Sequence, residues 1–240
     1  MPVLLNNAQK LLTDDQVAHY QAAGYLVVPN LLTSEAAATW KEQLKTRLVA
    51  EGKLDEPSGV RVWLADNLDP FSEEQIQTPA TIAILRQLIG PNVEFLSMKA
   101  VFKNSKTTFN SPWHQDWHYW QGAPKISVWI ALDDATPENG CLRLVPGSHR
   151  QVIEMQTIED GKGFNRRITD EQLAGLSIVD ASVPRGAAIF FHDLVLHGSC
   201  PNVNGQERWS AITTYRDAGE KDSSTVWNTA TVLSGQSVNL

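Results

Sequence analysis

The segment SPWHQDWHYW, residues 111–120, decides how the rest of the chain is interpreted, because it holds His114 and Asp116 in a His-x-Asp spacing. If the segment is an extended strand, residues two apart project from one face, and the imidazole and the carboxylate converge on one point. A lone His-x-Asp arises by chance in many chains, so the pattern needs a third ligand from elsewhere. His197, at the end of a short apolar run, is the candidate for that third ligand.

Two histidines and one carboxylate, two of them close in sequence and the third distant, form the facial triad of non-haem iron oxygenases. Such a triad leaves three coordination positions open for other groups. Zinc accepts the same ligands, so the ligand types alone do not choose the metal. The sequence contains no His-Glu-x-x-His motif, which disfavours a zinc hydrolase. A packed core histidine is the other interpretation of His197, and it is the one predicted for the neighbouring His192.

The composition predicts one globular domain, residues 1–240, with a small-molecule partner. Twenty basic residues against 27 acidic ones give a net charge of −7 without a clustered basic face, which disfavours nucleic acid and anionic membranes. Cys141 and Cys200 follow no metal-binding spacing, and no signal segment or membrane-length apolar run is present. We therefore expect a cytoplasmic protein; nothing in the sequence indicates its oligomeric state.

The first 92 residues are predicted to be a helical scaffold with one strand. Capping residues and helical periodicity mark the helices, and a short apolar run marks the strand. The predicted elements are a helix beginning at the capping box Thr13–Gln16, a strand at 24–28, a helix capped by Ser34 at 35–49, and a helix at 79–88. Residues 51–72 are interpreted as an irregular loop, either solvated or in contact with substrate.

Residues 93–216 are predicted to form a β-rich core, because short alternating runs follow one another between turn signals. The predicted strands are 95–103, the segment around His114, 124–132, 141–145, 186–191, 194–197 and 208–215. Asn139-Gly140 indicates a turn or hairpin before the fourth strand. The polar insert 150–182 either covers the mouth of the barrel or is a surface excursion. The tail, residues 217–240, has Trp227 as its candidate anchor.

Helices followed by many short strands predict a mainly β protein with a jelly-roll core, the double-stranded β-helix of cupin-like proteins, faced by the N-terminal helices. In such a fold the strands of His114 and His197 can meet in one open mouth. Arg208 begins the strand after His197, and a buried guanidinium needs an anion whose shape matches its fork. A dicarboxylate could chelate the metal at one end and pair with Arg208 at the other. It would fill the open metal positions and supply the anion for the guanidinium, and 2-oxoglutarate is such a molecule. A surface arginine is the alternative.

Four ordered motifs and Arg208 together resemble the phytanoyl-CoA dioxygenase family of iron(II)- and 2-oxoglutarate-dependent oxygenases. The motifs are GYLVVPNLLT at 24–33, SPWHQDWHYW at 111–120, VWIALDDATPENGCLRLVPGSHR at 128–150 and FHDLVLHGSCPN at 191–202. The resemblance covers roughly residues 12–216 and is more specific than any single motif.

The resemblance implies His114, Asp116 and His197 as iron(II) ligands, and Arg208 as the partner of the distal carboxylate of 2-oxoglutarate. It implies further co-substrate contacts from Ser199, Lys103 and Trp129, although Trp129 is equally interpreted as a core residue. The implied reaction consumes O2 and 2-oxoglutarate, releases succinate and CO2, and hydroxylates a small molecule. Related halogenases lack the carboxylate ligand, so Asp116 favours hydroxylation, while desaturation and ring formation stay open.

Substrate contacts are predicted from the residues that flank the metal pair. Trp117 and His118 follow it directly, and His118 lies two positions past Asp116, on the same face if the strand continues. Arg61, in the loop at 51–72, is a further candidate at the mouth. The alternative for Trp117 and His118 is that their rings simply pack in the fold. The alternative function is a non-catalytic metal- or ligand-binding cupin-like barrel, which has no need of an arginine at position 208.

Overall fold

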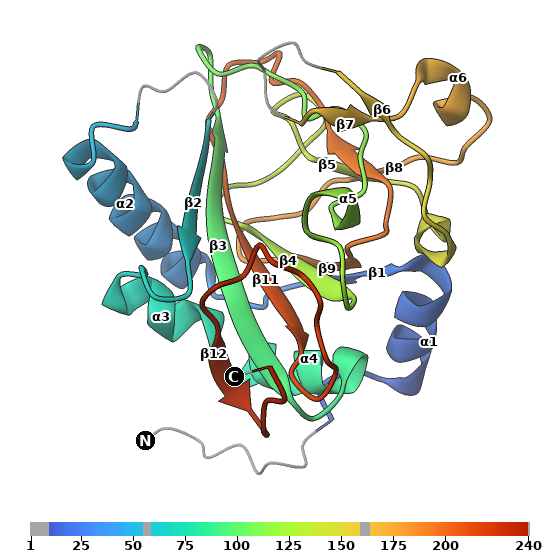
Figure 1. The fold of residues 1–240 in the computed structure, drawn as a ribbon. Coiled ribbons are helices and arrows are strands. Elements are labelled where there is room, and N and C mark those ends of the chain that lie inside the picture. Colours follow the sequence, from blue (N-terminus) through green and yellow to red (C-terminus); the bar gives the residue numbers. More distant parts are fainter. Residues whose placement is uncertain (1–9, 55–58, 159–163, 240) are drawn as a thin grey trace.

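The computed structural model describes residues 10–54, 59–158 and 164–239, and its centre is a long antiparallel sheet (Figure 1). In the described residues this sheet has seven strands in the order β1-β9-β4-β11-β3-β12, with β2 also beside β3. The strands are β1 (Tyr25–Val28), β2 (Val60–Leu64), β3 (Val93–Lys103), β4 (Lys125–Ala131), β9 (Ala188–His192), β11 (Arg208–Asp217) and β12 (Thr231–Ser234). All seven residues of β4 are buried, so both faces of the sheet are covered there.

A smaller sheet, in the order β10-β5-β8, packs against one face of the larger one. Its strands are β5 (Leu142–Leu144), β8 (Val179–Ala181) and β10 (His197–Ser199). One buried cluster joins Trp129 and Ile189 of the larger sheet to Leu142 and Leu144 of the smaller sheet. Two facing antiparallel sheets closed around a core make a jelly roll, so the predicted fold class is confirmed.

Helices cover the other face of the larger sheet. They are α1 (Asp14–Ala23), α2 (Ser34–Ala50), α3 (Pro70–Ile76) and α4 (Pro79–Ile89). Trp40 and Leu44 of α2 are fully buried in the same apolar cluster as Val128 and Ile130 of β4. Alternate residues of β4 therefore face the helices, whereas Trp129 faces the smaller sheet and the interior between the sheets. In the described parts of the chain, every helix is too short or too polar to cross a bilayer.

The predicted helices and most predicted strands are present, but several details of the prediction were wrong. The cap of α2 is Thr33, whose hydroxyl accepts from Ala36 N, and not Ser34. Residues 51–72 are not one irregular loop, because β2 and the start of α3 lie in them. The predicted strand 194–197 begins only at His197. Asn139-Gly140 does not close a hairpin, since β4 and β5 lie in different sheets.

The insert predicted at 150–182 contains small elements of its own. They are the end of the 3-10 helix η1 (Ser148–Arg150), the strand pair β6 (Gln156–Thr157) and β7 (Arg166–Arg167), the turn α6 (Asp170–Leu173) and β8. A third apolar cluster joins Met155 and Ile168 of the insert to Leu196, directly before β10. The insert is thereby packed onto the end of the barrel that carries His197.

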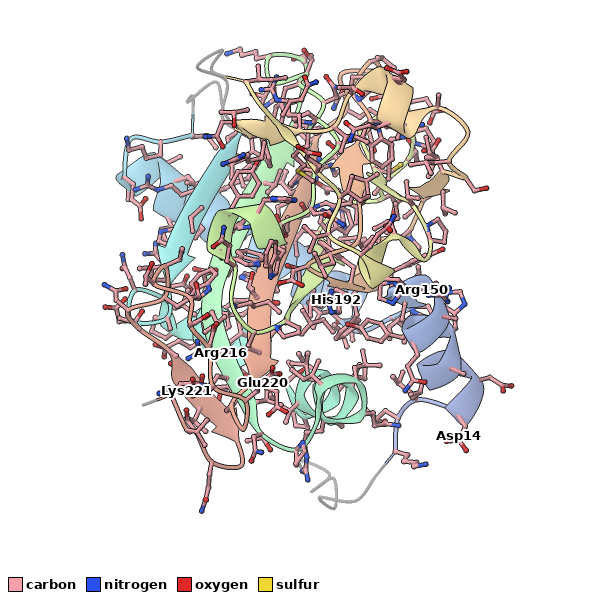
Figure 2. All side chains as sticks on the ribbon, turned by 45° about the vertical axis from the view of Figure 1, so that its right-hand side comes forward. Asp14, Arg150, His192, Arg216, Glu220 and Lys221 are labelled. Carbon is pink, nitrogen blue, oxygen red and sulfur yellow. The ribbon has the colours of Figure 1, made fainter. Side chains whose placement is uncertain are left out.

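The C-terminal tail is anchored by an ion network rather than by Trp227 alone. Asp222 is completely buried at its side chain and pairs with Lys125 of β4 at 2.9 Å and with Arg216 of β11 at 2.8 Å. Arg216 also pairs with Glu94 of β3 at 2.6 Å. Figure 2 shows Arg216 at the end of the molecule to which the tail returns. The Trp227 ring lies 5.5 Å from that of Trp120 and adds an apolar contact.

Replacing Asp222 by Asn is expected to lower the free energy of unfolding by about 3 kcal/mol, because it leaves the Lys125 and Arg216 cations buried with fewer anionic partners. Urea unfolding followed by circular dichroism measures the change. The control is Asp15→Asn, on the exposed face of α1, which should change the free energy by less than about 0.5 kcal/mol. Equal effects of the two substitutions would contradict the assigned role of Asp222.

Candidate metal centre

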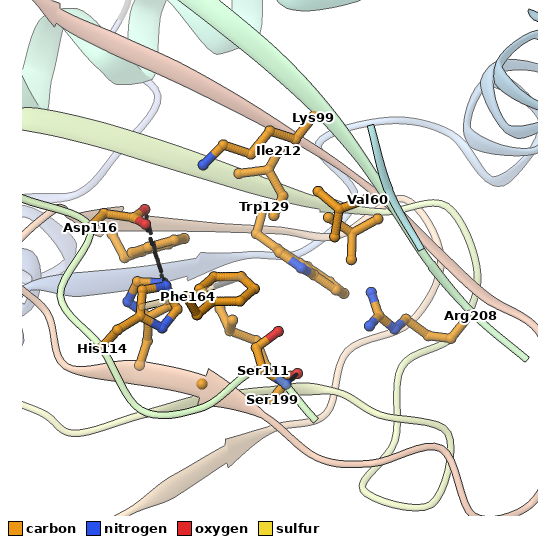
Figure 3. Close-up of a pocket in the computed structure, with 15 residues that line it drawn as sticks. Val60, Lys99, Ser111, His114, Asp116, Trp129, Phe164, Ser199, Arg208 and Ile212 are labelled. Atoms are coloured by element: carbon orange, nitrogen blue, oxygen red, sulfur yellow. Dashed lines mark hydrogen bonds and ion pairs between the residues drawn. The ribbon is translucent and has the colours of Figure 1, made fainter. Parts of the chain in front are cut away.

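His114, Asp116 and His197 converge at one end of a pocket between the two sheets (Figure 3). One ligand atom from each lies within 4.8 Å of the other two, and all three residues are buried. His114 Nε2 lies 3.5 Å from Asp116 Oδ1, and His197 Nε2 lies 3.9 Å from Asp116 Oδ2. Both imidazoles thus present the same ring nitrogen to the same carboxylate.

The backbone brings the two histidines together directly. His114 and His197 form an isolated antiparallel bridge, in which each N–H donates to the other residue's carbonyl at 2.9 Å. Asp116 reaches them differently, because the chain turns after Gln115 and Asp116 directly precedes the short helix α5 (Trp117–Trp120). The prediction that residues 111–120 form one strand is therefore wrong, although the His-x-Asp spacing does bring its two side chains together.

Each histidine is oriented by a carbonyl two residues earlier. His114 Nδ1 donates to Pro112 O at 2.7 Å, and His197 Nδ1 donates to Val195 O at 2.9 Å. With Nδ1 donating to a carbonyl, Nε2 is the ring nitrogen of each histidine that faces the centre of the site and can bind a metal. Two imidazoles and one carboxylate are a donor set that fits a divalent transition-metal ion.

The charges of the site favour the protonation states that metal binding requires. Burial, followed by the nearby His114, lowers the pKa of His197 to about 4, so its ring is neutral at pH 7. Burial acts to raise the pKa of Asp116, but the Lys99 ammonium and then the two histidines hold that pKa well below its usual range. The carboxylate is consequently ionised without any metal.

Gln115, between the two sequence-adjacent ligands, is a positioning residue that the sequence analysis missed. The residue is fully buried. Its side-chain Nε2 donates to Leu194 O at 2.7 Å and to Gln151 O at 3.0 Å, and its side-chain Oε1 accepts from Ile153 N at 2.8 Å. All these partners are backbone groups of distant segments. The residue therefore ties the ligand loop to the insert and to the turn before β10.

Arg208 lies at the other end of the pocket from the triad (Figure 3). It is 1% exposed, and its Nη1 donates to Ser210 Oγ at 2.8 Å. Its Nε has no hydrogen-bond partner within the described residues, and no carboxylate there pairs with the guanidinium. Its charge lies 5.5 Å from the centre of the Trp129 ring. A buried cation without an anion is costly, so this end of the pocket fits a carboxylate ligand.

Ser199 and Lys103 lie beside Arg208 but differ in their access to the pocket. Ser199 lines it, whereas Lys103 is completely buried behind and donates to Ser199 Oγ at 2.8 Å and to Cys200 O. Lys103 and Arg208 are direct partners in the β3–β11 ladder. Burial, followed by the charge of Arg208, lowers the pKa of Lys103 to about 7.

The structure places the three predicted substrate contacts away from this pocket. His118 donates through Nε2 to Ile153 O at 2.8 Å, and Trp117 donates to Gly122 O at 3.3 Å. Arg61 pairs with Glu51 at 3.1 Å. His118 was assigned by continuing the strand alternation past Asp116, and the turn into α5 removes that reason.

Other residues complete the wall of the pocket. Lys99 of β3, Val60 of β2 and Phe164 of the insert line it. The Phe164 ring lies 4.6 Å from that of His114, so a described part of the insert does reach the mouth. The signal for Lys99 was available in the sequence, because it shares a strand face with Val101 and Lys103.

A comparison with protein-family models identifies the family to which the chain belongs. The model of the phytanoyl-CoA dioxygenase family (PhyH) matches residues 20–210. The chain belongs to the phytanoyl-CoA dioxygenase family. L-proline trans-4-hydroxylase of Streptomyces griseoviridis is 25% identical over 228 residues, which cover 84% of this chain and 85% of the relative. The ectoine dioxygenase of Stutzerimonas stutzeri (strain A1501) is 24% identical, over 83% of this chain and 75% of that protein.

Solved structures give the same fold for this dioxygenase family member. EctD from S. alaskensis, solved with 2-oxoglutarate and 5-hydroxyectoine, has a TM-score of 0.72 at 21% identity and covers 89% of this chain and 79% of its own. The jelly roll and the enzyme class predicted from the sequence, a 2-oxoglutarate-dependent non-haem iron dioxygenase, are confirmed.

Proposed function

We propose that this dioxygenase holds iron(II) with His114, Asp116 and His197 and hydroxylates a small molecule. The reaction consumes O2 and 2-oxoglutarate and releases succinate and CO2. Three observations support these ligands: convergence within 4.8 Å, ring nitrogens oriented by backbone carbonyls, and a carboxylate that stays ionised. A facial set of this kind leaves positions for both co-substrates.

The observation that carries the proposal is the buried, anion-free guanidinium of Arg208 at the opposite end of the same pocket. We assign to it the distal carboxylate of 2-oxoglutarate, which its fork can bind bidentately. Ser199 supplies a hydroxyl to the same carboxylate, Lys103 holds that hydroxyl in place, and Trp129 forms the wall between Arg208 and the triad. In a non-catalytic barrel such an arginine would only destabilise the fold.

The bound metal and 2-oxoglutarate supply the oxidising power, and the protein supplies position and shelter. His114 and His197 are held in one tautomer by their own chain, and Asp116 is fixed at the start of α5 by the hydrogen bond from Trp117 N to Asp193 O at 3.2 Å. Apolar side chains, among them Phe164, Phe191 and Ile212, line the pocket and exclude water from the reacting groups.

Anaerobic addition of iron(II) and then 2-oxoglutarate to the metal-free protein tests the proposal. We expect a weak visible charge-transfer band that appears only when both are present, followed by release of succinate when O2 is admitted. A protein that binds iron but gives no band with saturating 2-oxoglutarate would overturn it and favour the binding barrel.

The affinity for 2-oxoglutarate is expected to fall as the pH rises through about 7, because Lys103 then loses the charge that attracts the dianion. Bound anion raises the pKa of Lys103, so the attraction is complete below pH 7 and is lost progressively as the pH rises above 7 through that raised pKa. Titrating the charge-transfer band at pH 6.5, 7.5 and 8.5 measures the dissociation constant, which we expect to rise several-fold. Lys103→Met should bind more weakly at pH 6.5 and vary less with pH; an unchanged slope would contradict the role of Lys103.

Small-molecule hydroxylation agrees with the names of the relatives, which are enzymes named for L-proline and ectoine. We propose that residues 1–240 act as one domain, since the tail and the N-terminal helices both pack on the larger sheet. Cys141 and Cys200 are free thiols, which supports a cytoplasmic location for the reaction.

A further inference from the structure

Lys99 is the one lysine that lines the pocket in the described part of the chain, and it acts on Asp116 through space without forming an ion pair with it. It lies on β3 four residues before Lys103, which corresponds to about 13 Å along the strand. In Figure 3 its side chain extends toward the side of Asp116 and away from Arg208. The charge of Lys99 is thus at the metal end of the pocket, where a substrate would be oxidised.

No carboxylate of the described residues pairs with Lys99. The shortest ion pairs of Asp116 are with the two histidines, at 3.5 and 3.9 Å, and Lys99 forms none within the 4.0 Å that defines such a pair. Its ammonium lies 5.1 Å from the centre of the Trp120 ring. This cation–π contact leaves the ammonium's hydrogen-bond donors free for a ligand.

The charges at the pocket support an anionic ligand for Lys99. In the proposed enzyme the two positive charges of iron(II) and the one of Arg208 are balanced by Asp116 and the two carboxylates of 2-oxoglutarate. Lys103, when protonated, adds a positive charge behind Ser199 at the co-substrate end, and Lys99 adds one at the metal end, where Ile212 is its partner in the β3–β11 ladder. A partly buried cation in such surroundings is stabilised by one negative charge.

We propose that Lys99 binds a carboxylate of the substrate, and that the substrate is a small monocarboxylic acid with an apolar body. Val60, Phe164 and Ile212 form the surface for that body. Because Lys99 is close to the triad, a bound carboxylate would hold a nearby C–H bond of the acid beside the metal. The inference rests on the proposed iron- and 2-oxoglutarate-dependent function and adds a substrate class to it.

Ligand binding without turnover tests the inference. The protein is loaded with zinc(II) in place of iron(II) and with 2-oxoglutarate, and binding is measured by saturation-transfer NMR. The probes are hexanoate, cyclohexanecarboxylate, phenylacetate and N-acetyl-L-prolinate, each with its primary amide. We expect at least one acid to bind about tenfold or more tightly than its amide, Lys99→Met to abolish that preference, and Lys99→Arg to retain it.

The control is Lys106→Met, an exposed lysine outside the pocket, which should keep the preference. A panel in which no acid binds better than its amide, or a preference that survives in Lys99→Met, overturns the inference. The charge-transfer band separates this failure from failure of the proposed function, because that band should persist in Lys99→Met with an affinity for 2-oxoglutarate that falls by less than tenfold. If that affinity falls tenfold in Lys99→Met, the lysine serves the co-substrate and the inference is wrong.

Discussion

His197→Ala is expected to abolish succinate release and to weaken metal binding by about a hundredfold or more. Loss of even an outer-sphere partner of a metal ligand typically costs about ten- to a hundredfold in affinity, and here a ligand itself is removed. His197 also forms the bridge that holds His114 opposite it, although through its backbone, which alanine retains. The expected loss is therefore specific to the ring and should not unfold the barrel.

Thermal unfolding with and without metal measures this effect. A metal present at a hundred times its dissociation constant stabilises the wild-type protein by about 2.7 kcal/mol, and this gain should disappear in the variant. His19→Ala, at an exposed position of α1, is the matched control and should keep both the gain and the activity. If His197→Ala retained metal-dependent stabilisation, the ligand assignment would be wrong.

Arg208→Ala is expected to raise the dissociation constant for 2-oxoglutarate between about thirtyfold and several-thousandfold. Truncating one partner of a buried, hydrogen-bonded charge pair costs about 2–5 kcal/mol. The band titration described above measures the constant, and iron(II) binding without the co-substrate should be unchanged. Arg208→Lys should recover little, since an ammonium cannot reproduce two parallel N–H···O bonds.

The same variant has an opposite effect on the empty protein. Arg208 is buried with its Nε unpartnered, so its removal should leave the unfolding temperature of the metal-free protein unchanged or higher. Arg86→Ala, on the distant helix α4, is the control for the affinity measurement. A drop in stability together with unchanged affinity would make Arg208 a structural residue and remove the main support for the co-substrate site.

Patterns within a short stretch of sequence predicted two kinds of element. These are helices fixed by their own capping residues and strands whose residues are all buried. The capping box at Thr13 is present, and β4 appears where alternation predicted it. β2 was missed because it is a partly exposed strand whose partners, such as Val101 for Val60, are some 40 residues away along the chain. Its existence depends on the ladder with β3, which no local pattern of residues 51–72 shows.

The site shows the same division between local and distant causes. The spacing of His114 and Asp116 was sufficient to pair them, although a turn rather than a strand does so. The turn is fixed by Asp193, whose carbonyl accepts from Trp117 N and whose carboxylate accepts from Trp120 Nε1 at 3.0 Å. Helical residues two apart point about 200° away from each other, so His118 could not follow Asp116 into the pocket.

Each ligand histidine takes its orientation from a carbonyl only two residues before it. The orientation of the two imidazoles is thus set by two short peptides, residues 112–114 and 195–197, whereas the position of Asp116 depends on the distant Asp193. Sequence drift in β2, the insert or the far end of β3 can reshape what the enzyme accepts while the two histidines keep their tautomers. Such a separation lets one oxidising centre acquire new substrates without losing its chemistry during the change.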